Sequence, residues 1–139
     1  MRITVLDGSN YFRGLLLLIR KDRKIDATEA HMIKRIGKTL GFEKKFCENA
    51  VREIMENTHI LDAPPEFSSK EVAMKFIRDG FIVALSDAEM HPAEEEWLRA
   101  TAEKNGLDGD WFRRESLIAR EKTASPIRLE VDDLTVAYS

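Results

Sequence analysis

The sequence predicts one all-α domain: a helical bundle of about six helices, built from two pseudo-repeats of three helices each. Three observations support this prediction. Apolar residues recur at helical spacing along most of the chain, capping residues mark the ends of these segments, and the chain matches itself when it is shifted by about 65 residues. With 139 residues, the chain is long enough for a single domain, 1–139, with a hydrophobic core.

The first repeat is expected at about residues 9–57. Its first helix is predicted at 11–21, with Ser9 or Asn10 as the cap, and its apolar run is much shorter than the roughly 20 residues that cross a bilayer. The second helix begins at the capping-box variant 26–29 and ends at Gly41, which is typical of a left-handed helix cap. The third helix is predicted at 43–57.

The second repeat is expected at about residues 70–122, after a linker at 58–69 that contains two consecutive prolines. Its first helix follows a capping box and ends near Asp87. The next helix opens at His91-Pro92, because proline is favourable at the first helical position, and it stops at Gly106. The last helix is predicted from about Gly109 to Lys122.

The tail, residues 123–139, differs from the rest of the chain. It holds two short β-prone stretches, 127–131 and 134–138, and a third stretch of this kind lies at 2–6. These pieces predict a small β element from the termini, either a hairpin or a three-stranded patch. A tail that is disordered or that binds a partner is an equally good interpretation of the same sequence.

The internal repeat is the strongest signal in the sequence. The shift places Asp22 on Asp87 and Glu29 on Glu94. It also places apolar residues of one copy on apolar residues of the other copy. Each copy leaves an apolar face that it cannot cover alone, so the two copies are expected to close on one another about a pseudo-twofold axis. Asp22 and Glu29 mark one acidic corner, and Asp87 and Glu94 mark the other. The sequence leaves open whether the axis brings these two acidic corners together or sets them at opposite ends.

Two stretches carry a resemblance to a known family. "ALSDAEMHPAEEEWLRATAEKNGL" and, more loosely, "LIRKDRKIDATEAHMIKRIGKTLGF" resemble the signature of tellurite-resistance TerB-like domains. In that signature an apolar helix ends in Ala-Asp-Gly, a hydrophobic residue follows, and a Glu begins the next helix. The resemblance covers roughly residues 12–120. It implies an all-α fold of two related halves, found in bacterial cytosolic stress and tellurium-resistance proteins and in some DnaJ-type cochaperones.

The resemblance also implies a site. Acidic residues of the family have been suggested to hold a divalent cation, which here would be Ca²⁺, Mg²⁺ or Mn²⁺. The positions that match are Asp22, Glu29, Asp87 and Glu94. The chain departs from the signature after each Asp, where Arg23 and Ala88 replace the family's Gly.

A local explanation competes with the cation site. Negative charge in the first turn of a helix is stabilised by the helix macrodipole, which by itself accounts for the acidic residues 94–96. His91 can be a transition-metal ligand beside these carboxylates, or it can cap the helix at the position that Asp26 takes in the first repeat. No EF-hand pattern is present, because the spaced ligands and central Gly of that loop are missing.

The remaining features indicate a non-enzymatic protein. The single cysteine, Cys47, lies on an apolar helix stripe, and the absence of a second cysteine fits a reducing cytoplasmic setting. A net charge of −3 does not favour nucleic acid, although one basic set offers contacts to phosphates. That set is Arg20, Lys21, Arg23, Lys24, Lys34, Arg35 and Lys38. No phosphate-binding loop, Ser/His/Asp arrangement or Cys pair occurs in the sequence.

The leading functional hypothesis is therefore a TerB-like stress-response domain that binds a protein partner and a divalent cation at its acidic corners. Two alternatives stay open. One is a metal-free structural adaptor that docks through its C-terminal tail. The other is an enzyme that uses paired carboxylates for acid–base chemistry.

Overall fold

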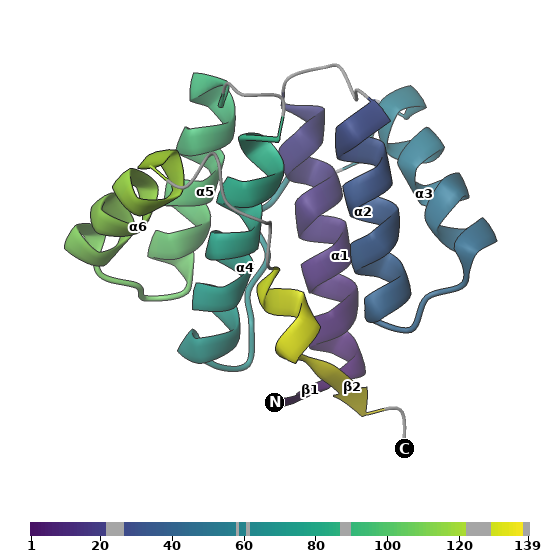
Figure 1. Cartoon of the computed structure of the whole chain (residues 1–139), viewed down its shortest axis with the longest axis horizontal. Coiled ribbons are helices and arrows are strands. Elements are labelled where there is room, and N and C mark those ends of the chain that lie inside the picture. Colours follow the sequence, from purple (N-terminus) through teal and green to yellow (C-terminus); the bar gives the residue numbers. More distant parts are fainter. Residues whose placement is uncertain (22–26, 58, 61, 87–89, 122–128, 138–139) are drawn as a thin grey trace.

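A computed structural model of the chain describes residues 1–21, 27–57, 59–60, 62–86, 90–121 and 129–137. The described part contains six α-helices, which are α1 (Val5–Arg20), α2 (Ala27–Thr39), α3 (Lys44–Glu56), α4 (Lys70–Ala84), α5 (Pro92–Lys104) and α6 (Gly109–Glu121). It also contains strand β1 (Arg2–Thr4), a 3₁₀ helix η1 (Glu130–Asp133) and strand β2 (Thr135–Ala137). The predicted all-α bundle with a small β element from the termini is confirmed (Figure 1). None of the described helices combines the length and the apolar character that a membrane span requires.

The helices form two related groups, α1–α3 and α4–α6. In each group the first helix packs on the second and third, and α1 packs on α4 between the groups. Residues that a twofold axis relates can touch one another only close to that axis. Tyr11 and Phe76, which are equivalent under the repeat, do so, with ring centroids 5.3 Å apart. The predicted doubling of a three-helix unit is therefore present in space.

Helices α1 and α4 run side by side in the same direction. Near their starts, Asp7 of α1 accepts a hydrogen bond from the backbone of Ser68, just before α4. Further along, the hydroxyl of Tyr11 donates to Asp79. The ends of α1 and α4, and the starts of α2 and α5, therefore lie at the same end of the bundle (Figure 1).

Helix α1 begins earlier than the sequence predicted. Thr4 caps it, with its side chain accepting from the backbone N–H of Asp7 at 3.0 Å. The prediction of Ser9 or Asn10 as the cap is wrong, because the helix already includes both residues. The run Thr-Val-Leu looks β-prone, but the threonine hydroxyl at the start of the run satisfies a free backbone donor of the first turn.

The other predicted helix ends that fall on described residues hold closely, whereas Asp26, the predicted start of the second helix, lies outside the described residues. Gly41 and Gly106 have positive φ angles of 92° and 72°. Ser69 caps α4 by accepting from Val72, and His91 caps α5. Helix α4 ends at Ala84, slightly before the predicted end near Asp87, which lies outside the described residues.

The termini meet in a parallel pair instead of a hairpin. Ile3 of β1 lies opposite Val136 of β2. The two paired strands are therefore separated in the sequence by all six helices. The β-prone stretch at 127–131 does not supply a strand in its described part, because η1 begins at Glu130. The 3₁₀ turn allows Val131 to be buried completely while the chain still reaches β1.

Candidate functional site

The structure describes half of the predicted cation site. Glu29 and Glu94 lie in the first turns of α2 and α5, and both are about 1% exposed. Asp22 and Asp87 lie outside the described residues. The starts of α2 and α5, which carry Glu29 and Glu94, lie at the same end of the bundle (Figure 1). The described residues contain no group of three or more His, Cys, Asp or Glu side chains arranged to hold a metal ion.

The capping explanation holds for the second corner. The backbone N–H of His91 donates to Glu94 Oε1 at 2.9 Å, and His91 Nδ1 accepts from the backbone of Ala93 at 3.1 Å. This reciprocal capping box satisfies donors that the start of a helix leaves free. Helix structure therefore accounts for the positions of both His91 and Glu94.

Basic residues at the same end are engaged with the linker. Arg20 donates to the carbonyl oxygen of Ile60 at 3.1 Å, and both Arg20 and Lys21 form ion pairs with Asp62. Trp97 of the second repeat donates to the backbone oxygen of Asp62 at 3.2 Å. Burial, and then the neighbouring Arg20 charge, lower the pKa of Lys21. These two cations therefore join the repeats at this end, and they do not form a ready surface for phosphates.

Sequence analysis did not single out the most distinctive polar residue, Asp79 of α4. Its side chain is completely buried, at 0% exposure. Its Oδ2 accepts from the Tyr11 hydroxyl at 2.6 Å and from the backbone of Val131 at 2.9 Å, and Oδ1 accepts from the backbone of Glu130 at 2.6 Å. Burial raises the pKa of Asp79 to about 7, although the three hydrogen bonds act in the opposite direction.

Two of the three donors to Asp79 belong to the C-terminal segment, residues 129–137. Its 3₁₀ helix η1 contacts α4 and α2, and the chain then continues into β2 beside β1 (Figure 1). Three of the segment's apolar side chains, Leu129, Val131 and Leu134, are at most 5% exposed. Asp79 is thus the polar centre of a contact between the helical bundle and a short segment that follows the second repeat.

Ion pairs surround this contact. Lys75 Nζ lies 3.2 Å from a carboxylate oxygen of Glu130, and Arg78 lies 3.7 Å from its other oxygen. Arg35 of α2 pairs with Asp132 at 2.8 Å. We call the part of the bundle formed by Arg35, Lys75, Arg78 and Asp79 the α2–α4 surface. It combines one buried acceptor for backbone N–H groups with cations that match the acidic side chains of the segment.

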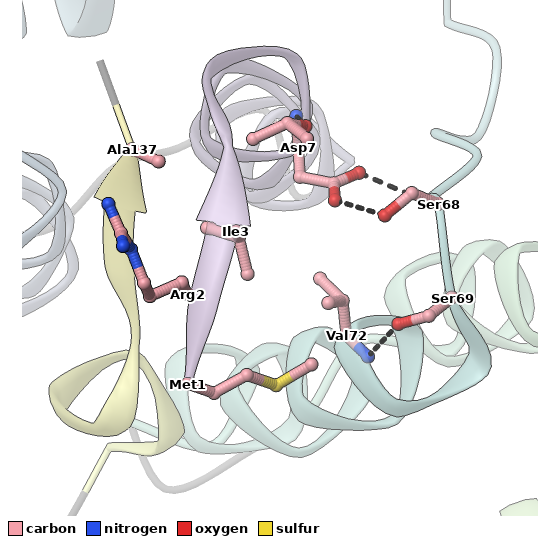
Figure 2. A pocket seen from close by; sticks show the side chains of 9 residues that line it. Met1, Arg2, Ile3, Asp7, Ser68, Ser69, Val72 and Ala137 are labelled. Carbon is pink, nitrogen blue, oxygen red and sulfur yellow. Dashed lines mark hydrogen bonds between the residues drawn. The ribbon is translucent and has the colours of Figure 1, made fainter. Parts of the chain in front are cut away.

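An open depression lies beside strand β1, between this strand and the start of α4 (Figure 2). Its volume is about 350 Å³. Asp7 points toward Ser68 at its edge, and its carboxylate accepts from both the backbone N–H and the hydroxyl of that serine. Because Ser68 already occupies this carboxylate, the polar groups here serve to join α1 to the segment before α4.

The single cysteine, Cys47, is a poor candidate for a nucleophile. Cys47 is 1% exposed, and burial raises the pKa of its thiol. A buried thiol of raised pKa stays protonated at neutral pH, whereas a nucleophilic cysteine needs the thiolate. Cys47 packs against α2, where its sulfur would meet any Cβ added at Gly37.

Comparisons with protein-family models, with curated proteins and with solved structures found no match to the chain.

Proposed function

We propose that this chain is a non-enzymatic protein-interaction domain of the TerB-like stress-response type. The observation that supports this proposal is the docking of a short segment, which follows both repeats, on the α2–α4 surface. A surface that holds a short acidic and apolar segment by its backbone and its charges has the features of a peptide-binding site. The doubled helical unit is also the architecture that the family resemblance implies.

Asp79 argues against the alternative of a paired-carboxylate enzyme. Its raised pKa of about 7 is the property expected of a general acid or base. However, it is 0% exposed, and both of its oxygens accept hydrogen bonds from the protein. A catalytic carboxylate must reach the proton that it transfers, so Asp79 suits recognition of the segment better than acid–base chemistry.

The adaptor alternative, in which the tail docks onto a partner, requires release of the segment. Residues 129–137 already use their apolar side chains and two backbone N–H groups on the chain's own bundle. These groups cannot contact a partner at the same time. We therefore propose that the bundle supplies the binding surface and that the segment covers it.

The proposal is tested by exchange of the segment. A protease site inserted after Ser125 allows the folded chain to be cut without loss of any described residue. After cleavage, a fluorescent peptide of residues 126–139 is expected to bind saturably, by fluorescence anisotropy, whereas the uncut chain is expected not to bind it. The same peptide carrying Val131→Asp is the matched control, and it should bind at least about tenfold more weakly because it would bury a charge. Loss of the helical fold on cleavage, or equal binding of both peptides, would contradict the proposal.

Cation binding at the acidic corners remains a separate prediction. A ligand that binds only the native state raises its melting temperature. If Asp22, Glu29, Asp87 and Glu94 hold a divalent cation, millimolar Ca²⁺, Mg²⁺ or Mn²⁺ should raise the melting temperature of the wild type by a few degrees. Thermal denaturation of the Asp87→Asn/Glu94→Gln variant should show no such rise. An equal response of the two proteins, or none in the wild type, would reject the cation site.

A further inference from the structure

The docked segment presents a regular chemical pattern to the α2–α4 surface. Leu129, Val131 and Leu134 are buried, at positions one, three and six of a hexapeptide. Glu130 and Asp132, at positions two and four, pair with cations of the surface. Asp133, at position five, lies at the surface, and its carbonyl oxygen accepts from the Met1 amino group at 2.8 Å. The pattern thus has apolar residues at positions one, three and six and acidic residues at positions two and four.

Each part of the surface recognises a different property of this pattern. Asp79 accepts from two consecutive backbone N–H groups, which every peptide without proline at these positions provides. The cationic side chains of Arg35, Lys75 and Arg78 favour acidic residues at positions two and four. Buried contacts then require apolar side chains at the other positions.

The buried carboxylate of Asp79 is better explained by recognition of a peptide backbone than by stabilisation of the fold. Burying an ionisable group is costly, and well-packed apolar residues usually stabilise a protein as well or better. Tyr11 supplies the only side-chain donor that the structure describes for Asp79, and the other two donors come from the segment. The carboxylate is therefore fully satisfied only when a peptide backbone lies on the surface.

We propose that the α2–α4 surface binds a segment of a partner protein that has apolar residues at positions one, three and six and acidic residues at positions two and four, and that the C-terminal segment is its intramolecular competitor. The inference rests on the proposed function and specifies the class of partner. The competitor is covalently attached, so its effective concentration is high, and a partner must either carry a stronger version of the pattern or meet the chain when the segment is released.

The test uses the complete chain and a labelled peptide that contains Ile-Asp-Ile-Glu-Asp-Val, which keeps the chain's own aspartate at position five, with Ile-Lys-Ile-Lys-Asp-Val as its match with reversed charges at positions two and four. The variant Glu130→Lys/Asp132→Lys releases the segment by placing lysines against the cationic surface, and it changes no apolar core residue. We expect the acidic peptide to bind this variant at least about tenfold more tightly than the wild type, because the competitor is removed. Raising the ionic strength from about 0.05 M to about 0.5 M should weaken the binding.

A second variant controls for effects of the introduced lysines other than release of the segment. Val131→Asp also disfavours docking of the segment, but it leaves Glu130 and Asp132 unchanged. Both variants should keep the helical circular dichroism signal and should bind the acidic peptide. Equal binding of the acidic and charge-reversed peptides, equal binding by wild type and variants, or loss of the helical fold in both variants would overturn the inference. If the chain's own segment exchanges after cleavage but the designed peptide fails to bind, the proposed function stands and this partner class is rejected.

Discussion

Asp79→Asn is expected to remove a pH dependence of about 4 kcal/mol from the free energy of unfolding. In the native protein, burial raises the pKa of Asp79 from 3.8 to about 7, and the charge of Glu130 adds to this effect. A difference of about three pH units between the folded and unfolded states corresponds to about 4 kcal/mol. The native state binds the proton more tightly than the unfolded state does. The contribution of Asp79 therefore makes the wild type less stable as the pH rises from about 4 to about 7, and it is constant above that range.

Urea denaturation of the wild type and of Asp79→Asn between about pH 4 and pH 8 measures this effect. The other carboxyl groups are common to both proteins, so the difference between the two free energies isolates Asp79. The advantage of the wild type over the variant should shrink as the pH rises. Asp110→Asn is the control, because this side chain is 70% exposed and its replacement should change the stability by less than about 0.5 kcal/mol.

A difference in unfolding free energy that changes with pH in the opposite direction would also be informative about Asp79. If the advantage of the wild type grew with pH, the three hydrogen bonds to Asp79 would stabilise its ionised form by more than burial destabilises it. Tyr11→Phe would then identify the contribution of the hydroxyl, which donates at 2.6 Å. A hydrogen bond to a charged group typically contributes about 1.5 to 3 kcal/mol.

The features that the sequence predicted correctly are those set by local interactions. Helix ends at Gly41 and Gly106 need only the left-handed conformation that glycine adopts readily. The capping box at His91 and Glu94 connects groups three residues apart. The repeat was recognisable because both copies use the same order of helices, turns and apolar positions, and this order fixes how each three-helix unit packs.

The features that the sequence did not reveal depend on contacts between distant parts of the chain. Asp79 receives hydrogen bonds from Tyr11, 68 positions away, and from Val131, 52 positions away. A local signal was nevertheless present, since this aspartate is one helical turn from Phe76 and from Val83, which are both completely buried. A charge at such a position indicates a buried polar contact, but only the fold identifies its partners.

The course of the C-terminal segment was unpredictable for a similar reason. Its β-prone stretches fit a hairpin locally, yet the parallel pairing of Ile3 with Val136 depends on both termini arriving beside each other. The start of α1 was missed because the residues that cap it also have a high β propensity. In the candidate cation site, the capping role of Glu94 could be inferred from sequence, whereas the burial of Glu29 required the fold.

Gly14→Ala is expected to lower the free energy of unfolding by about 1 to 3 kcal/mol, although alanine is the better helix former. A Cβ atom at Gly14 would lie 2.7 Å from Cζ and 2.8 Å from Cε1 of the Phe76 ring, and 2.9 Å from Pro65 Cγ. The ring cannot easily move away, because Tyr11 and Phe67 pack against it with centroids 5.3 and 5.1 Å distant. The small residue thus sets the close approach of α1 to α4.

Gly109→Ala is the matched control for this prediction. It makes the same chemical change at the first residue of α6, where an added Cβ would meet nothing within 4 Å. Its stability should be unchanged or raised by up to about 1 kcal/mol, because alanine restricts the unfolded chain and favours the helix. Urea denaturation of both variants tests the difference. If Gly14→Ala proved as stable as Gly109→Ala, the two central helices would be able to separate without cost, and the packing between the repeats would not fix the position of Tyr11 relative to Asp79.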